Sequence, residues 1–213
     1  MTYTRATAVS RIQRGLGFRT DLEDEIVDAL KEAQRLLERG KSLPYFLLGE
    51  DQTLTVASGS ADVSLPTGFI REKQDEPLRF TDSDNNLIKL EKVSLDVGVT
   101  RFADVDAGKP QAYALRKSAI KFFPTRDTAY SLTWSYFVAA DELTTDITNA
   151  WLTNAPEVLV GAAGMIISSD LGANGEKAMA KFQQMFNIAW AGVFAEGVLR
   201  EDENKPVIVG GRL

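Results

Sequence analysis

Residues 20–40 read TDLEDEIVDALKEAQRLLERG, with apolar side chains recurring every three or four positions. That spacing places them on one face of an α-helix. Glu23, Asp24 and Glu25 come early, where the helix dipole favours negative charge. Thr20-Asp21-Leu22-Glu23 has the form of a capping box, and Gly40 can supply a left-handed residue at the end. The stretch predicts a long amphipathic helix that packs through Leu22, Ile26, Ala29, Leu30, Ala33 and Leu37.

Helical periodicity returns on both sides of this stretch. A shorter helix is predicted around residues 7–14, ended by Gly15 and Gly17. In the last third, residues 157–171 are rich in Ala and Gly, and residues 176–200 carry a second apolar stripe. The stripe comprises Ala178, Phe182, Met185, Phe186, Ala189, Val193 and Val198 or Gly197, with Trp190 and Phe194 beside it.

The middle of the chain changes to the patterns of β-strands. Short apolar or alternating segments are separated by clusters of Gly, Pro, Asp and Asn, which favour turns. The predicted strands are 54–56, 61–65, 87–90, 112–115, 119–123 and 130–138, and residues 95–104 are compatible with a short helix. Residues 50–138 therefore predict a compact antiparallel β unit.

Together these patterns predict an α+β fold. The N- and C-terminal helices form one helical bundle, and an antiparallel β domain is inserted between them. The predicted division is 1–49 and 141–200 for the two parts of the bundle, 50–140 for the β domain and 201–213 for an extended C-terminal arm. A chain of 213 residues is long enough for one core with a smaller satellite.

Composition narrows the possible functions. The net charge is -6 and the basic residues are scattered among acidic ones, which does not favour binding to nucleic acid or to an anionic membrane. The sequence contains no cysteine and no histidine, which excludes thiolate chemistry and makes imidazole catalysis and most zinc sites impossible. No secretory signal or membrane-spanning segment is visible, so we expect synthesis in a cytoplasm.

One loop has a partial metal-binding pattern. Asp82, Asp84 and Asn86 match the first three ligand positions of a calcium loop. However, Leu87 stands where that loop needs Gly, and Val93 stands where it needs a bidentate Glu. A hairpin turn accounts for the same residues, because Asp and Asn favour turns. We predict no metal site, no cofactor and no catalytic residue, and hence no enzyme.

Two other functional classes remain as alternatives. A hydrolase could use only Asp and Glu as acid and base, although no pair is singled out by its spacing. A monomeric ligand-binding module could use aromatic residues of the β domain as a platform, although such residues more commonly form a core. These aromatic residues are Tyr113, Phe122, Phe123, Tyr130, Trp134, Tyr136 and Phe137.

Small residues cluster in the segment 157–171. Gly161, Ala162, Ala163 and Gly164 follow one another directly, and small side chains permit close approach of a second helix. That helix can belong to the same bundle or to a neighbouring subunit, and both possibilities stay open.

Several separated pieces of the chain resemble one family, and they occur in its order. They are Ile12 with Leu16-Gly17-Phe18-Arg19 and the following helix, Leu43-Pro44-Tyr45-Phe46-Leu47-Leu48, Val63-Ser64-Leu65-Pro66-Thr67-Gly68-Phe69-Ile70-Arg71-Glu72, Gly108-Lys109-Pro110-Gln111-Ala112-Tyr113-Ala114-Leu115, and Asn149-Ala150-Trp151-Leu152-Thr153-Asn154-Ala155-Pro156. This series resembles the head-to-tail adaptor, or connector, proteins of tailed bacteriophages. Each motif is a structural pattern without a catalytic signature.

The resemblance implies a structural virion protein of the particle neck. Such adaptors form a ring, typically of twelve copies (a dodecamer), beneath the portal protein. The ring extends the channel through which genomic DNA passes without specific binding, and it presents the attachment surface for tail or nozzle proteins. The implied partners are therefore the portal, tail proteins and further copies of the chain, made in a bacterial cytoplasm, with no membrane.

The end of the chain predicts a contact of its own. Pro206 prevents a continued helix, and Val207, Ile208 and Val209 form a β-prone apolar triplet after a polar stretch. Such an arm can add as an extended strand to a neighbouring subunit or to the portal. Alternatively, the triplet folds back on its own bundle.

Overall fold

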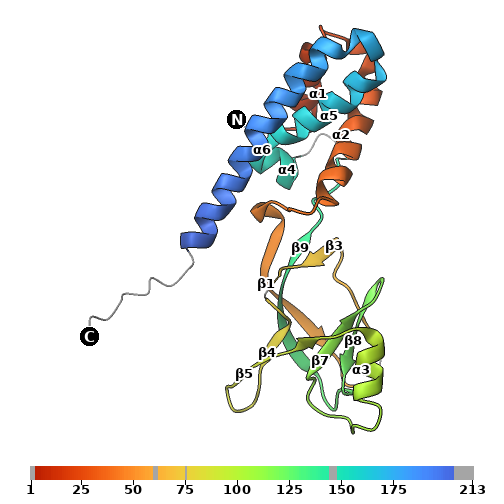
Figure 1. The fold of residues 1–213 in the computed structure, drawn as a ribbon, viewed down its shortest axis with the longest axis vertical. Coiled ribbons are helices and arrows are strands. Elements are labelled where there is room, and N and C mark those ends of the chain that lie inside the picture. Colours follow the sequence, from red (N-terminus) through yellow and green to blue (C-terminus); the bar gives the residue numbers. More distant parts are fainter. Residues whose placement is uncertain (1–2, 60–61, 75, 144–147, 204–213) are drawn as a thin grey trace, which may run out of the picture. The chain divides into compact units, whose positions relative to one another are not determined.

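The computed structural model describes residues 3–59, 62–74, 76–143 and 148–203 (Figure 1). The chain divides into two compact units. Unit 1 comprises Met1–Leu47 and Ala140–Leu213, and unit 2 comprises Leu48–Ala139. Unit 1 is helical, whereas unit 2 is mainly β-sheet, and the predicted α+β class is confirmed.

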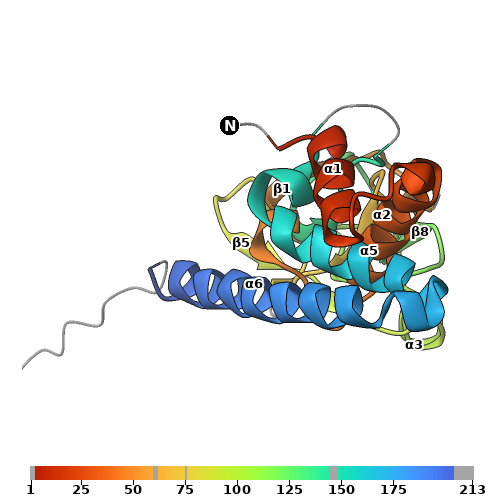
Figure 2. The same ribbon diagram turned by 90° about the horizontal axis from the view of Figure 1, so that it is seen from above.

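Unit 1 is built around a central helix, α5. Its helices are α1 (Arg5–Gly15), α2 (Glu23–Glu38), α4 (Ala150–Asn154), α5 (Pro156–Asp170) and α6 (Glu176–Glu203), with 3-10 turns η1 (Thr20–Leu22), η2 (Tyr45–Leu47) and η3 (Gly172–Asn174). Figure 2 shows α5 between α6 on one side and α1 and α2 on the other, and α5 contacts all three. Its position explains why α5 is apolar around much of its circumference.

The directions of the helices follow from their contacts. Gly164 of α5 lies against Phe182 of α6, and Gly161, three residues earlier, lies against Phe186, four residues later. Helices α5 and α6 are therefore antiparallel. The last turn of α2 hydrogen-bonds to α4, which immediately precedes α5, so α2 is antiparallel to α5 as well. Consequently α2 and α6 run in the same direction.

The helix predicted from residues 20–40 forms, but its start differs from the prediction. Ile26, Ala29, Leu30 and Ala33 are buried, as the apolar spacing indicates. The capping box at Thr20 was wrong, because residues 20–22 wind into the 3-10 turn η1 and no side chain caps α2. The tighter turn uses the backbone groups that a capping side chain would otherwise satisfy.

Unit 2 contains two sheets in its described residues. One has the strand order β1-β9-β4-β5 with β3 also paired to β9, and the other has the order β2-β8-β7-β6. The strands are β1 (Leu48–Val56), β2 (Val63–Ser64), β3 (Phe69–Glu72), β4 (Arg79–Thr81), β5 (Leu87–Lys89), β6 (Glu91–Lys92), β7 (Ala112–Leu115), β8 (Ala119–Phe123) and β9 (Tyr130–Val138). Leu95–Arg101 forms the short helix α3.

Among the named strands of unit 2, the pairing is antiparallel, as predicted, with one exception. Strands β6 and β7 pair in parallel through Glu91↔Ala112 and Lys92↔Tyr113, because α3 lies between them in the chain. Strands β1 and β9 pair along their length, from Leu48↔Phe137 to Val56↔Tyr130. The chain therefore enters and leaves unit 2 on two neighbouring strands.

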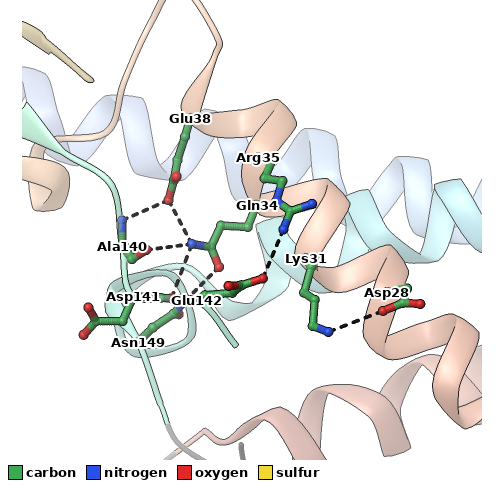
Figure 3. Close-up of polar contacts among 9 residues, drawn as sticks. All are labelled: Asp28, Lys31, Gln34, Arg35, Glu38, Ala140, Asp141, Glu142 and Asn149. Atoms are coloured by element: carbon green, nitrogen blue, oxygen red, sulfur yellow. Dashed lines mark hydrogen bonds and ion pairs between the residues drawn. The ribbon is translucent and has the colours of Figure 1, made fainter. Parts of the chain in front are cut away.

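A polar network in unit 1 holds the segment that follows β9 (Figure 3). Gln34 of α2 is buried and donates to the carbonyl oxygen of Ala140 at 2.9 Å. Glu38 accepts from the backbone N–H of Ala140 at 3.0 Å. The amide of Asn149 donates to Gln34 Oε1 at 3.0 Å and to the carbonyl of Asp141 at 2.9 Å. Both backbone groups of Ala140 are thus bonded to the last two turns of α2.

Candidate interaction surfaces

Both oxygens of the Asp82 carboxylate interact with other groups of the protein. Asp82 Oδ1 accepts from the backbone N–H of Asp84 at 3.0 Å and of Asn86 at 2.9 Å, which is an Asx turn. Lys109 places its ammonium 3.3 Å from Oδ2. These interactions, chiefly the hydrogen bond from the backbone N–H of Asn86, hold the pKa of Asp82 below its usual value. A lysine of the same unit therefore supplies positive charge at this carboxylate.

Within the described ranges, acidic side chains do not gather into a group that could hold a metal ion. Among the described residues, every carboxyl group with a shifted pKa has it lowered. A hydrogen bond lowers the pKa of Asp21 (from Arg19), Asp127 (from Tyr130), Glu196 (from Arg200) and Asp82, as described above. The pKa of Glu76 is lowered as well, because hydrogen bonds from Lys73 and Ser135 outweigh its partial burial. A carboxylic acid that protonates a leaving group needs a raised pKa. The shifted carboxyls therefore do not favour a hydrolase.

One buried tyrosine links the two sheets of unit 2. Tyr113 of β7 donates its hydroxyl to Glu72 of β3 at 2.8 Å, and Lys92 also pairs with Glu72. Burial, and then the charge of Glu72, raise the pKa of Tyr113 well above its usual value. A phenol held in this way keeps its proton at neutral pH. The cluster is therefore suited to stabilising the unit rather than to proton transfer.

The aromatic residues of unit 2 lie mainly in its core. Tyr113, Phe122 and Trp134 belong to one buried cluster, and Phe123 belongs to a second. Tyr130 and Tyr136 are half-buried and pack against the first cluster. Because the largest rings are covered, these side chains do not form an open platform.

The four small residues of α5 have different surroundings. Gly161, Ala163 and Gly164 are buried, and Ala162 is half-buried. A Cβ on Gly164 would overlap the ring of Phe182, and one on Gly161 would lie 2.9 Å from Cβ of Phe186. The two glycines thus permit close packing of α5 against α6 within the chain.

Helix α6 is much longer than its partner. It has 28 residues and α5 has 15, which correspond to about 42 Å and about 22 Å at 1.5 Å per residue. Its last turns extend past the start of α5, as Figure 1 shows within unit 1. There Arg200 lies over the ring of Tyr45, with Cζ 4.1 Å from the ring centroid, and pairs with Glu196 at 2.8 Å. These contacts tie the extended end of α6 to η2.

The side of α6 that faces away from α5 is exposed and largely apolar. Ile188 and Leu199 have exposed fractions of 68% and 64%, and Val198 has 58%. The prediction that Val198 or Gly197 lies on the packed face holds for Gly197, because Val198 is exposed and Gly197 is half-buried beside Tyr45. We define the outer face of α6 as Lys177, Lys181, Gln184, Ile188, Ala191, Gly192, Ala195 and Leu199, all of them exposed.

Sequence reasoning missed this face although a signal was available. No charged residue occurs from Phe182 to Ala195, so apolar residues occupy both sides of the helix there. A helix that is apolar on two sides normally buries both of them. The predicted arm at Pro206, Val207, Ile208 and Val209 lies outside the described residues.

Comparison with known protein families gives a match that covers almost the whole chain. A family model described as SU10 adaptor protein matches residues 1–209, which span unit 2 and nearly all of unit 1. No curated protein matches the sequence. In the part of the chain that the structure describes, no helix combines the length and the hydropathy needed to cross a membrane.

Proposed function

The chain belongs to the SU10 adaptor protein family, and from this membership we propose that it forms a ring beneath the portal of a tailed-phage particle. The ring extends the DNA channel and offers the surface to which tail or nozzle proteins attach. The observation that carries this proposal is the family match over residues 1–209. We propose twelve copies per ring, located in the particle neck, because adaptors that the sequence resembles have that arrangement.

The electrostatics of the chain are compatible with a DNA channel. The net charge is -6, and a negative lumen repels the phosphate backbone, so that DNA slides instead of binding. The proposed role requires protein partners and no chemistry. We therefore propose a non-enzymatic protein without a cofactor. The uniformly lowered pKa values of the shifted carboxyls and the buried aromatic rings of unit 2 weigh against the two alternatives.

Electron microscopy of the full-length chain mixed with the portal protein of the same phage tests the proposal. We expect closed rings on one end of the portal, because a template of fixed symmetry selects the rotation that closes a head-to-tail contact. The chain alone is expected to be monomeric or weakly associated. A chain that stays unbound, or that stacks into open filaments, would refute the adaptor role.

The C-terminal arm gives a second test. We propose that Val207, Ile208 and Val209 add to a neighbouring subunit or to the portal through backbone hydrogen bonds. Deleting residues 206–213 should leave the thermal melt followed by circular dichroism unchanged and sharply weaken portal binding. Equal binding would remove the arm from the contact, whereas a lower melting temperature would show that the triplet belongs to the bundle.

A further inference from the structure

We propose that the outer face of α6 in one copy packs against the outer face of α2 in the next copy, and that this contact repeats around the ring. The inference rests on the ring proposed above and names the surfaces that build it. We define the outer face of α2 as Glu25, Asp28, Glu32, Leu36 and Arg39, which are all exposed and lie along one flank of its buried stripe.

The outer face of α6 has the character of an interface core. Its central part is uncharged, and depletion of charge is the compositional mark of a buried contact. A Cβ on Gly192 would meet no atom within 4 Å, so the backbone of a neighbouring copy can approach there. Exposed Ile188 and Leu199 lie on either side of this glycine. A helix with these features buries its second apolar side when a partner is present.

The charges on the two outer faces are complementary. Helix α6 carries Lys177 and Lys181 before its apolar part, and no described residue forms an ion pair with either. Helix α2 carries Glu25, Asp28 and Glu32 before Leu36, which is 54% exposed. Asp28 pairs with Lys31 of its own helix at 3.4 Å, so Glu25 and Glu32 supply the acidic charge that is not already paired among the described residues. A basic half followed by an apolar part on one helix thus corresponds to an acidic half followed by an exposed Leu on the other.

The positions of these groups along the two helices also agree. Eleven residues separate Lys177 from Ile188, and eleven separate Glu25 from Leu36, which is about 16 Å in each helix. Both helices are antiparallel to α5 and so run in the same direction. In a ring whose axis follows the helices, the rotation between neighbours keeps this direction. The lysines of one copy then face the carboxylates of the next while Ile188 faces Leu36.

The faces belong to different sides of unit 1, since α6 and α2 pack on different sides of α5 (Figure 2). A contact between two different surfaces is heterologous. When two copies join in this way, one of them still has a free α6 face and the other still has a free α2 face. Repetition therefore adds copies until the ring closes. A symmetric contact between two α6 faces would stop at a dimer, and with the two helices parallel it would oppose lysine to lysine.

Disulfide trapping tests the contact directly, because the chain contains no cysteine of its own. Glu32 and Gln184 each lie one turn before the apolar residues that we pair, and both are exposed. The Glu32→Cys, Gln184→Cys double variant, assembled on portal and oxidised, should give a ladder of covalent oligomers up to the ring. A mixture of the two single variants should give cross-linked dimers, and either single variant alone should give none. Pairing Gln184→Cys with Ser10→Cys, an exposed position of α1, is the control and should not cross-link.

Charge reversal gives a second, independent readout. Lys177→Glu with Lys181→Glu should raise the protein concentration needed for complete rings by roughly tenfold, because carboxylates then face carboxylates across the contact. Glu25→Lys with Glu32→Lys in the same chain should restore assembly. All four positions are exposed, so an unchanged circular dichroism melt verifies the fold.

The outcomes separate this contact from the proposed function. Rings that form on portal without cross-linking between positions 32 and 184, and that tolerate the lysine reversal, would overturn the α6–α2 contact and leave the adaptor role standing. In that case the outer face of α6 is covered by the portal or by the chain's own terminus. Absence of rings from the unmodified chain would instead overturn the proposed function.

Discussion

A single carboxylate oxygen, Oε1 of Glu38, accepts hydrogen bonds from three donors at the end of α2. They are Gln34 Nε2 at 3.1 Å, the backbone N–H of Ala140 at 3.0 Å and Nε1 of the fully buried Trp151 at 3.0 Å. Replacing Glu38 by Ala leaves at least two of these donors without an acceptor. We expect the free energy of unfolding to fall by about 2–4 kcal/mol, measured by urea denaturation.

The matched control for Glu38 lies one turn earlier on the same helix. Arg35 pairs with Glu142 at 3.0 Å, but their side chains are 63% and 53% exposed. An exposed ion pair contributes little, so Arg35→Ala should cost less than about 1 kcal/mol. Equal effects of the two substitutions would show that the network around Ala140 adds no stability beyond an ordinary surface pair.

Two glycines of unit 1 should respond to alanine in opposite ways. A Cβ on Gly164 would overlap the ring of Phe182, which is 2% exposed and cannot move aside. We expect Gly164→Ala to destabilise the protein by about 1–3 kcal/mol. Gly192 has open space, so Gly192→Ala should stabilise the isolated chain by up to about 1 kcal/mol through helix propensity. Thermal unfolding distinguishes the two signs, and a stabilising Gly164→Ala would contradict the close packing of α5 and α6.

At the level of elements, the hairpin of β4 and β5 depends on the charge of Asp82. The pKa of Asp82 is lower in the folded protein than in the unfolded chain, chiefly because the N–H of Asn86 donates to its carboxylate. A lowered pKa stabilises the fold at pH values above the unfolded value of about 4, and this contribution is lost as the pH falls through the lower, folded value. The protection of the amides at residues 82–86 from exchange, relative to the intrinsic rate at each pH, should therefore fall below about pH 4. Asp82→Asn should abolish this pH dependence, and an unchanged profile would exclude Asp82 as its cause.

The long helices could be predicted from sequence, because their periodicity repeats over many turns. The apolar spacing of α2 identified Ile26, Ala29, Leu30 and Ala33 as core residues, and all four are buried. Gln34 was missed as a network residue, since a lone polar side chain beside an apolar stripe gives no indication of its partners. Those partners lie more than 100 residues away in the chain.

The short strands were harder to predict than the helices. Strands β3, β4 and β6 have four, three and two residues, too few for an alternating pattern to stand out. The parallel pairing of β6 with β7 depends on a crossover through α3, which local patterns do not reveal. The outer face of α6 was missed because its apolar residues were sought on one side of the helix, whereas Ile188 and Leu199 lie on the other.

At the level of the whole molecule, unit 2 is a continuous segment whose two ends pair with each other. Leu48 pairs with Phe137, so the ends of residues 48–139 meet without the remainder of the chain. We expect this fragment to fold alone and to unfold cooperatively. Its one tryptophan, Trp134, is 1% exposed and stacks on Phe69 at 5.0 Å, so its fluorescence should be blue-shifted. Emission at the wavelength of free tryptophan would show that unit 2 requires unit 1.

The paired strands β1 and β9 also have a mechanical meaning. Force between the two units travels along two covalent chain crossings, at Leu47–Leu48 and at Ala139–Ala140, and is shared between them. Load arriving along β9 reaches Ala140, whose N–H and C=O are bonded to Glu38 and Gln34. Part of the load is therefore carried by these hydrogen bonds to the end of α2. Two connecting segments, one of which is hydrogen-bonded to a helix, resist stretching better than a single linker does.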